Sequence, residues 1–339
     1  MRVPGLGSQL DAIAAAESFS GVVRVERPRQ PLVERAYGLA DKRHAVPNRV
    51  DTQFGIASGT KSLTALTVVS LIAEGRFELT TTARSLLGDD LPQIAGDVTI
   101  EHLLSHRSGI GDYLDEEVEI DYTDYLMPVP AQELATTEQY LPILDGHPTK
   151  FTAGERFGYC NSGFVVLALI AERVSGIQFP ELVRERVCKP AGMVSTAFLR
   201  SDELPGSAAI GYLEVDGVWR TNVFHLPVRG TGDGGIYTTV GDVSGFWSAL
   251  FSGRIVSDEW VAELVRSRSE DTGASAATHR RYGLGFWLHA VTDVVTMSGG
   301  DTGVAFRSSH DRATGVTVTA ISNTDHACRP VWDFLWETL

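Results

Sequence analysis

The 339-residue chain has few cysteines, no excess of basic residues and no apolar run long enough to span a bilayer. Its three cysteines, Cys160, Cys188 and Cys328, lie far apart and form no C-x-x-C pair, which argues against a disulfide framework and against a zinc knuckle. A formal net charge of −14 argues against a nucleic-acid partner, which would need a basic face. With 43% hydrophobic and 21% charged residues, the composition is typical of a soluble globular protein.

The N-terminal segment also lacks the apolar core that a signal peptide places before a small-residue cleavage site. The cysteine pattern fits a reducing compartment. We therefore expect a cytoplasmic protein with no membrane partner.

What the chain does contain is a nucleophile pattern in residues 54–75. Residues 62–75 are apolar at helical spacing and end at Gly75, which predicts a buried helix with Ser58 and Lys61 at its start. Positions three apart share one helix face, so the lysine nitrogen can reach the serine hydroxyl. A desolvated lysine can take the serine proton, and the free N–H groups of the first turn can stabilise an oxyanion. The alternative is a capping serine followed by a solvated lysine.

Two further stretches carry groups suited to the same chemistry. Tyr159 and Asn161 are two apart just before an apolar helix, and an extended segment would point both side chains the same way. A phenol near a cation can relay a proton, and an amide can orient a lysine or hold a substrate carbonyl. Residues 297–303 lie at the end of an expected strand, where glycines let backbone N–H groups approach a ligand.

Other motifs point to different chemistry with less support. His102 and His106 are one helical turn apart, as in zinc peptidases, but Leu103 stands where the glutamate base would be, so we expect no metal and no cofactor. Residues 230–235 match G-x-G-x-x-G without the strand–turn–helix context of a dinucleotide fold, which predicts a tight glycine loop. The acidic run from Asp112 to Asp124 predicts a solvated loop or helix face.

The order of expected elements indicates the architecture. A hairpin at 20–38 precedes the Ser58 helix, helical stretches including 133–141, 164–174 and 179–187 fill the middle, and strands at 282–289, 294–297, 303–307 and 316–321 precede a terminal helix from 329. Pro142 is expected to end the helix at 141. This order predicts an α/β (α+β) protein whose antiparallel sheet, built from both chain ends and flanked by helices, holds an inserted all-helical lobe. The expected domains are 1–57 with 210–339, and 58–209, with the active site in the cleft between them.

Taken together, the motifs resemble the serine β-lactamase-related hydrolases close to class C β-lactamases, which include class VIII esterases, D-aminopeptidases and DD-carboxypeptidase-like enzymes. The stretches that carry the resemblance are residues 54–61, 99–110, 159–161, 234–239 and 298–300. The resemblance implies a β-lactamase/transpeptidase-like fold and a small-molecule ester, amide or lactam substrate.

Residue roles follow from the same resemblance. It makes Ser58 the acylated nucleophile, Lys61 its base or base-orienting partner, and Tyr159 the proton shuttle to the leaving group. Asn161 would contact Lys61 and the substrate. The N–H groups of Ser58 and Gly300 would form the oxyanion hole, with Ser298 and Gly299 among the substrate-binding residues. Whether Lys61 or Tyr159 is the base in acylation stays open, because the two would titrate as a coupled pair.

One position departs from the family pattern. Many relatives have lysine or histidine where this chain has Met297, and a cation there would bind a substrate carboxylate. With Met297 in the substrate site, the sequence favours an esterase or amidase acting on small, uncharged acyl substrates. The alternatives are a β-lactamase or a D-amino-acid peptidase or carboxypeptidase, and a catalytically degenerate, penicillin-binding-like assembly protein.

Overall fold

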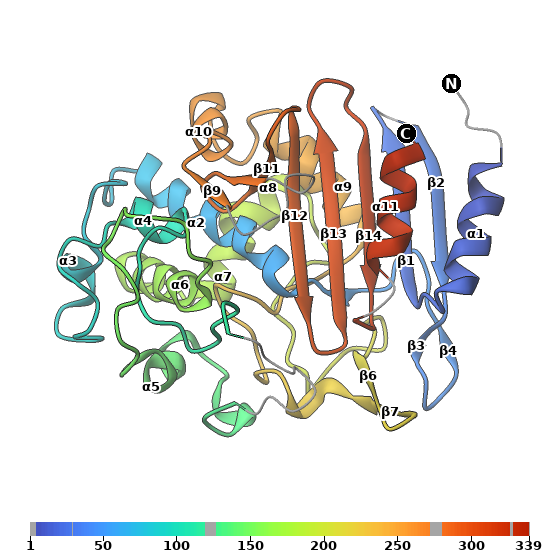
Figure 1. Cartoon of the computed structure of the whole chain (residues 1–339), viewed down its shortest axis with the longest axis horizontal. Helices are drawn as coiled ribbons and strands as arrows, with labels where there is room; N and C mark the ends of the chain where they lie inside the picture. The colour runs from blue at the N-terminus through green and yellow to red at the C-terminus, as the bar shows by residue number, and fades with distance from the viewer. Residues whose placement is uncertain (1–4, 29, 119–126, 272–279, 326–327, 339) are drawn as a thin grey trace.

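An eight-stranded antiparallel sheet organises the fold (Figure 1). The computed structural model describes residues 5–28, 30–118, 127–271, 280–325 and 328–338. The strand order is β2-β1-β14-β13-β12-β11-β10-β9, so strands from the two ends of the chain meet where β1 pairs with β14. The strands are β1 (Gly21–Arg27), β2 (Gln30–Tyr37), β9 (Ser269–Asp271), β10 (Arg280–Tyr282), β11 (Trp287–His289), β12 (Val294–Asp301), β13 (Val304–Asp311) and β14 (Thr317–Ser322).

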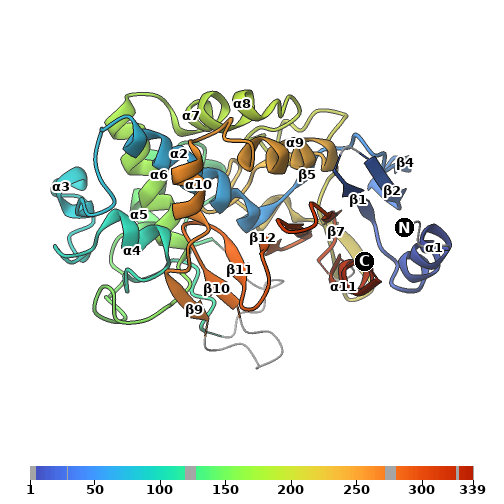
Figure 2. The ribbon, with the colours of Figure 1, turned by 90° about the horizontal axis from the view of Figure 1, so that it is seen from above.

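Helices cover both faces of this sheet (Figure 2). On one face α1 (Leu6–Ala16) and α11 (Cys328–Thr338) bury Leu10, Trp332 and Leu335 against strand residues such as Val23 and Val318. On the other face lies α9 (Val240–Leu250), whose apolar residues join the main core. Every residue of β14 is buried, because this central strand has helices on both sides.

The remaining helices gather beside the sheet around two buried ones (Figure 1). These are α2 (Thr60–Ala73), which follows the 3₁₀ turn η1 (Ala57–Gly59), and α6 (Asn161–Ser175). Both are buried on nearly all sides, which is the pattern of a helix enclosed by protein. Around them lie α3 (Ala83–Leu87), α4 (Ile100–Leu104), α5 (Leu141–Leu144), α7 (Phe179–Val183), the π-helical turn η4 (Arg184–Cys188), α8 (Lys189–Ala191) and α10 (Asp258–Leu264).

Three two-stranded sheets and several 3₁₀ turns complete the described part of the chain. The small sheets pair β3 (Leu39–Asp41) with β4 (Val46–Pro47), β5 (Phe54–Gly55) with β8 (Tyr237–Thr238), and β6 (Tyr212–Val215) with β7 (Val218–Thr221). Within the described residues, no single helix is long and apolar enough to cross a membrane, although α6 taken together with Phe179–Ala191, bent by 85°, passes that test.

The expected fold class is confirmed, and two expected elements are corrected. The stretch 282–289 is not one strand but includes the end of β10 and all of β11, which pair with each other antiparallel. The sheet joins both ends of the chain and a helical lobe lies between them in sequence. The stretch 133–141 is not one helix but the 3₁₀ turns η2 (Ala131–Glu133) and η3 (Thr137–Tyr140) leading into α5. Pro142 lies in the first turn of α5 rather than ending a helix. A proline is tolerated there because N–H groups in the first turn have no hydrogen-bond partner within the helix. The division into domains 1–57 with 210–339, and 58–209, stays a prediction.

Candidate active site

Ser58 and Lys61 lie where η1 runs into α2, with Lys61 enclosed by protein. Lys61 Nζ is 2.9 Å from Ser58 Oγ, and the lysine is only 2% exposed. Nζ also donates to Asn161 Oδ1 at 2.7 Å and to the backbone oxygen of Asp233 at 2.8 Å. Burial lowers the pKa of Lys61, and the carboxylates of Asp233 and Glu116 act in the opposite direction. The alternative of a solvated first-turn lysine is therefore wrong.

Tyr159 lies against the other side of Ser58, in a stack of rings. Burial raises the pKa of Tyr159 well above its ordinary value, while the nearby Ser58 hydroxyl acts in the opposite direction. Trp287 stacks on the tyrosine ring with centroids 6.1 Å apart, and the His106 ring lies 4.3 Å away. The His106 Nδ1 accepts a hydrogen bond from the Cys160 N–H at 3.1 Å. The stacked rings thus hold Tyr159 beside the serine, and burial keeps its phenol neutral.

The sequence predicted that Asn161 lies on an extended segment before the helix, but the structure makes it the first residue of α6. Its Oδ1 accepts from Lys61, as the sequence predicted, while its Nδ2 donates to Leu114 O at 2.9 Å and to Glu116 Oε1 at 3.1 Å. Asn161 is 3% exposed and is not among the residues that line the cleft. The amide therefore orients Lys61, and its nitrogen is occupied by the protein rather than directed at a substrate.

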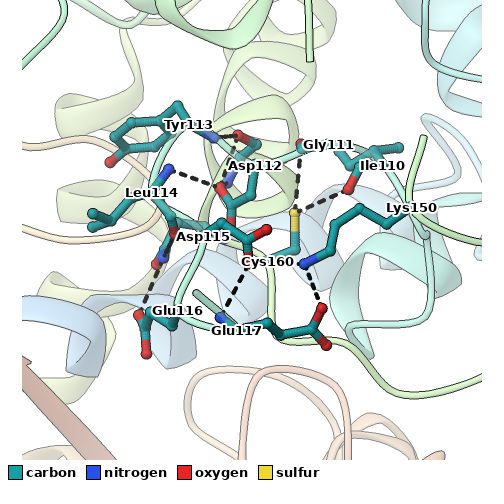
Figure 3. Close-up of polar contacts among 12 residues, drawn as sticks. Ile110, Gly111, Asp112, Tyr113, Leu114, Asp115, Glu116, Glu117, Lys150 and Cys160 are labelled. Carbon is teal, nitrogen blue, oxygen red and sulfur yellow. Dashed lines mark hydrogen bonds and ion pairs between the residues drawn. The ribbon is translucent and has the colours of Figure 1, made fainter. Parts of the chain in front are cut away.

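The first part of the acidic run is engaged in the site rather than forming a solvated face (Figure 3). Asp112 is 7% exposed and accepts from the N–H groups of Asn161 at 2.7 Å and Ser162 at 2.8 Å, so it satisfies the free donors at the start of α6. Burial raises the pKa of Asp112 to about 6.

The next acidic residues tie the same loop to its neighbours. Asp115 and Glu117 both pair with Lys150, at 2.8 and 2.6 Å, as Figure 3 shows. The interpretation of this stretch as simply solvated is therefore wrong for the buried Asp112, whereas Glu116 and Glu117 are exposed, as expected, and are also held by hydrogen bonds or ion pairs. The remaining acidic residues of the run, Glu119, Asp121 and Asp124, lie outside the described residues.

The end of β12 forms the opposite wall. Ser298, Gly299 and Gly300 line a cleft of about 810 Å³ together with Ser58 and Tyr159. A Cβ on Gly299 would be 2.1 Å from the oxygen of Ile56 and 2.7 Å from the backbone nitrogen of Ser58, so the strand can approach η1 this closely only with glycine. A Cβ on Gly300 would meet nothing within 4 Å.

Met297 does not lie where the sequence interpretation put it. It is 2% exposed, belongs to the main hydrophobic core and does not line the cleft, because successive residues of β12 face opposite sides of the sheet. Its assignment as a substrate-binding residue is therefore wrong, and the argument for uncharged substrates that rested on it loses its basis.

The two glycines of β12 provide a matched pair of stability variants. Gly299→Ala is expected to lower the free energy of unfolding by about 1–3 kcal/mol, because the new methyl group overlaps backbone that cannot move aside easily. Gly300→Ala introduces the same methyl group into open space and should leave the free energy of unfolding within about 0.5 kcal/mol. Chemical denaturation measures both, and equal effects would contradict the close contact of β12 with η1.

The weaker motifs of the sequence have other roles. The His102 Nδ1 accepts from the Thr99 N–H, completing a capping box at α4, while His106 packs on Tyr159. No group of three or more His, Cys, Asp or Glu in the described ranges could hold a metal ion. The glycine loop 230–235 is indeed tight, but sequence reasoning missed that it delivers Asp233 to Lys61. The one signal for this was an acidic residue enclosed by glycines.

Comparison with known proteins places these features in a family context. The family model described as Beta-lactamase matches residues 10–335. Esterase EstB of Burkholderia gladioli is 29% identical, with 94% of this chain and 91% of that protein covered. The putative penicillin-binding protein PbpX of Bacillus subtilis and a D-aminopeptidase of Cereibacter sphaeroides are each 26% identical, over 80% and 90% of this chain. The chain spans only 62% and 56% of the lengths of these last two proteins.

Solved structures of other proteins share the fold of this chain. A penicillin-binding protein from Bacillus halodurans is 32% identical, with a TM-score of 0.89 over 97% of this chain and 100% of that one. A D-amino acid amidase from Ochrobactrum anthropi, 23% identical, shares the fold with a TM-score of 0.80 over 98% of each chain.

Proposed function

Because the chain belongs to the β-lactamase family of serine acyl-hydrolases, we propose that it is an esterase or amidase that works through an acyl-enzyme on Ser58. The observation that carries the proposal is the 2.9 Å contact between Ser58 Oγ and the buried Lys61 Nζ. A lysine in this position has no structural need to be buried, whereas an acyl-transfer enzyme needs a base beside its nucleophile.

In the proposed reaction, the substrate carbonyl lies between the N–H groups of Ser58 and Gly300. Ser58 Oγ attacks the carbonyl carbon, and the resulting oxyanion is stabilised by these two donors. The Ser58 proton passes to the Lys61–Tyr159 pair, and Tyr159 returns a proton to the leaving group. Water then attacks the Ser58 ester, which releases the acid and restores the serine. Asn161 holds Lys61 throughout by its hydrogen bond of 2.7 Å.

Parallel assays on a short-chain p-nitrophenyl ester and a chromogenic cephalosporin test this proposal. We expect steady turnover of the ester, with each reaction accompanied by a transient mass increase on Ser58 that equals the acyl group. A folded protein that turns over neither compound and gains no mass would contradict the proposal and favour an assembly protein.

A second candidate, a β-lactamase or a peptidase acting on D-amino-acid termini, is favoured by Arg307. This residue of β13 lines the cleft and lies directly opposite Ser298 in the sheet register. Its guanidinium stacks on Trp332 at 3.9 Å, and its buried Nε has no partner. Among the described residues its guanidinium makes no hydrogen bond or ion pair, whereas that of nearby Arg280 pairs with Asp271 at 3.0 Å. An unpaired cation beside the cleft suits a substrate with an anionic group.

Arg307→Gln separates the two candidates. We compare kcat/KM for meta-acetoxybenzoate, whose leaving group carries a carboxylate, with kcat/KM for its neutral methyl ester. If Arg307 binds the carboxylate, the ratio of the two falls about tenfold in the variant, since a hydrogen bond to a charged group is lost. Arg312→Gln, which removes an exposed arginine of the same hairpin, is the control and should keep the ratio. An unchanged ratio in Arg307→Gln would leave the neutral-ester activity as the better description.

A further inference from the structure

The glycine loop 230–235 and Ile236 directly after it pass over the start of α2 and are attached to it at three points. Thr64 Oγ1 donates to Gly232 O at 2.7 Å, Lys61 Nζ donates to Asp233 O at 2.8 Å, and the Ile236 N–H donates to Thr60 Oγ1 at 3.1 Å. A Cβ on Gly232 would be 2.1 Å from the oxygen of Phe164, so the loop is also pressed against α6. The loop is thus fixed between the two helices that carry Lys61 and Asn161.

Asp233 brings a carboxylate into this enclosed space. The residue is 8% exposed, and its Oδ2 accepts a hydrogen bond of 2.5 Å from the Tyr113 hydroxyl. Burial raises the pKa of Asp233, while the nearby charge of Lys61 and the hydrogen bond from Tyr113 act in the opposite direction. A buried carboxylate is tolerated when it is hydrogen-bonded and faces an opposite charge, and both conditions are met here.

We propose that Asp233, anchored by Tyr113, is a positioning residue that holds Lys61 against Ser58 and supplies a buried negative charge to its ammonium group. This inference rests on the proposed function, since it concerns the same base. The backbone oxygen of Asp233 fixes the direction of the ammonium, and the carboxylate of the same residue sets how firmly Lys61 holds its proton. One residue thereby couples the geometry of the base to its charge state.

Other groups also face Lys61 and remain in place when Asp233 is changed. Glu116 and Asp112 act on it from the 112–117 loop, but both are hydrogen-bonded at the start of α6, to Asn161. The thiol of Cys160 lies in the same surroundings, and burial raises its pKa well above the ordinary value. The rings of Tyr159 and His106 complete the enclosure, and burial lowers the pKa of His106, so neither ring is charged near neutral pH.

The direction of the effect follows from Coulomb's law. A negative charge beside a buried ammonium stabilises the protonated form, so its removal lowers the pKa of the lysine. Asp233→Asn keeps an oxygen that can accept from Tyr113 and keeps the backbone oxygen, but loses the charge. The limb of the pH profile that reports Lys61 must then move to lower pH, whichever protonation state of Lys61 is the active one.

The test measures the second-order rate constant for labelling of Ser58 by a fluorophosphonate as a function of pH. Labelling needs the activated serine but no turnover. In Asp233→Asn we expect the Lys61 limb to shift by about one unit toward lower pH. Tyr113→Phe removes the hydrogen bond to the Asp233 carboxylate, which then keeps its proton to higher pH, so we expect a smaller shift in the same direction. This variant is the second test if Asp233→Asn does not fold.

Asp242→Asn is the matched control. Asp242 is also 8% exposed and accepts from Thr196 at 2.7 Å, but it is not among the charges that act most strongly on Lys61, so loss of its charge should affect stability and leave the limb in place. A purely structural role for Asp233 predicts an unmoved limb in all three variants, which would overturn this inference alone. Wild-type protein that is folded but not labelled at any pH would overturn the proposed function, and the inference with it.

Discussion

Replacing Ser58 with alanine is expected to abolish hydrolysis, with kcat lowered by ~10⁴-fold or more. The hydroxyl that forms the acyl bond is lost, and no other hydroxyl is hydrogen-bonded to Lys61 Nζ among the described residues. The fold should persist, because Lys61 keeps its bonds to Asn161 and to the Asp233 backbone. Initial rates on a p-nitrophenyl ester, together with the thermal unfolding midpoint, measure both expectations.

Ser62→Ala is the matched control for this variant. Ser62 lies one turn further along, and its Oγ donates to Gly285 O at 2.7 Å, away from the cleft. Its replacement should cost about 1–3 kcal/mol of stability, because a buried carbonyl loses its partner, while hydrolysis continues. Turnover near the wild-type rate in Ser58→Ala, or loss of turnover in Ser62→Ala alone, would contradict the assignment of the nucleophile.

Replacing Lys61 with methionine is expected to lower kcat by ~10³-fold or more, since the residue proposed to take the serine proton is gone. Methionine has a similar length and no charge, so the buried volume is filled while the acceptors on Asn161 and Asp233 lose their donor. The variant should therefore fold with a reduced unfolding midpoint. Single-turnover measurements of acylation on Ser58 separate this chemical defect from any change in substrate binding.

Lys61→Arg provides the informative comparison. An arginine keeps the positive charge but does not release its proton in the range where the enzyme works, and its planar group does not fit three acceptors arranged around an ammonium. We expect it to be as inactive as Lys61→Met. Activity close to wild type in Lys61→Arg would mean that the residue acts only as a fixed charge and that Tyr159 alone accepts the proton.

The nucleophile and its partners could be predicted from the sequence because their positions depend on local geometry. Ser58 and Lys61 are three apart at a helix start, and that spacing alone brings their functional groups together. The capping of α4 by Thr99 is equally local. The order of strands and helices was enough to predict a sheet formed by both chain ends, because this depends on hydrophobic periodicity rather than on single contacts.

The surroundings of Lys61 could not be predicted, because they depend on packing between distant segments. Asp233 reaches Lys61 across 172 positions, and Trp287 of β11 stacks on Tyr159, which precedes α6. Charge patterning also misled: a run of acidic residues has the same composition whether it is solvated or, like Asp112, caps a buried helix. Tertiary structure decides between the two.

Met297 shows a different kind of error. The family motif gives the position of Met297 along the chain but not the face of the strand on which its side chain lies. Since successive strand residues alternate between faces, Met297 and Ser298 cannot both point into the cleft. The structure buries the methionine in the core and leaves Ser298 lining the cleft opposite Arg307.

The account rests on Ser58 as a nucleophile activated by its neighbours, and the most direct measurement is the mass of the intact protein after brief exposure to a fluorophosphonate, followed by peptide mapping. The account predicts one phosphonyl adduct per chain, located on Ser58, and none on folded Ser58→Ala protein under the same conditions. A folded wild-type protein that acquires no adduct, or an adduct that persists in Ser58→Ala, would contradict it.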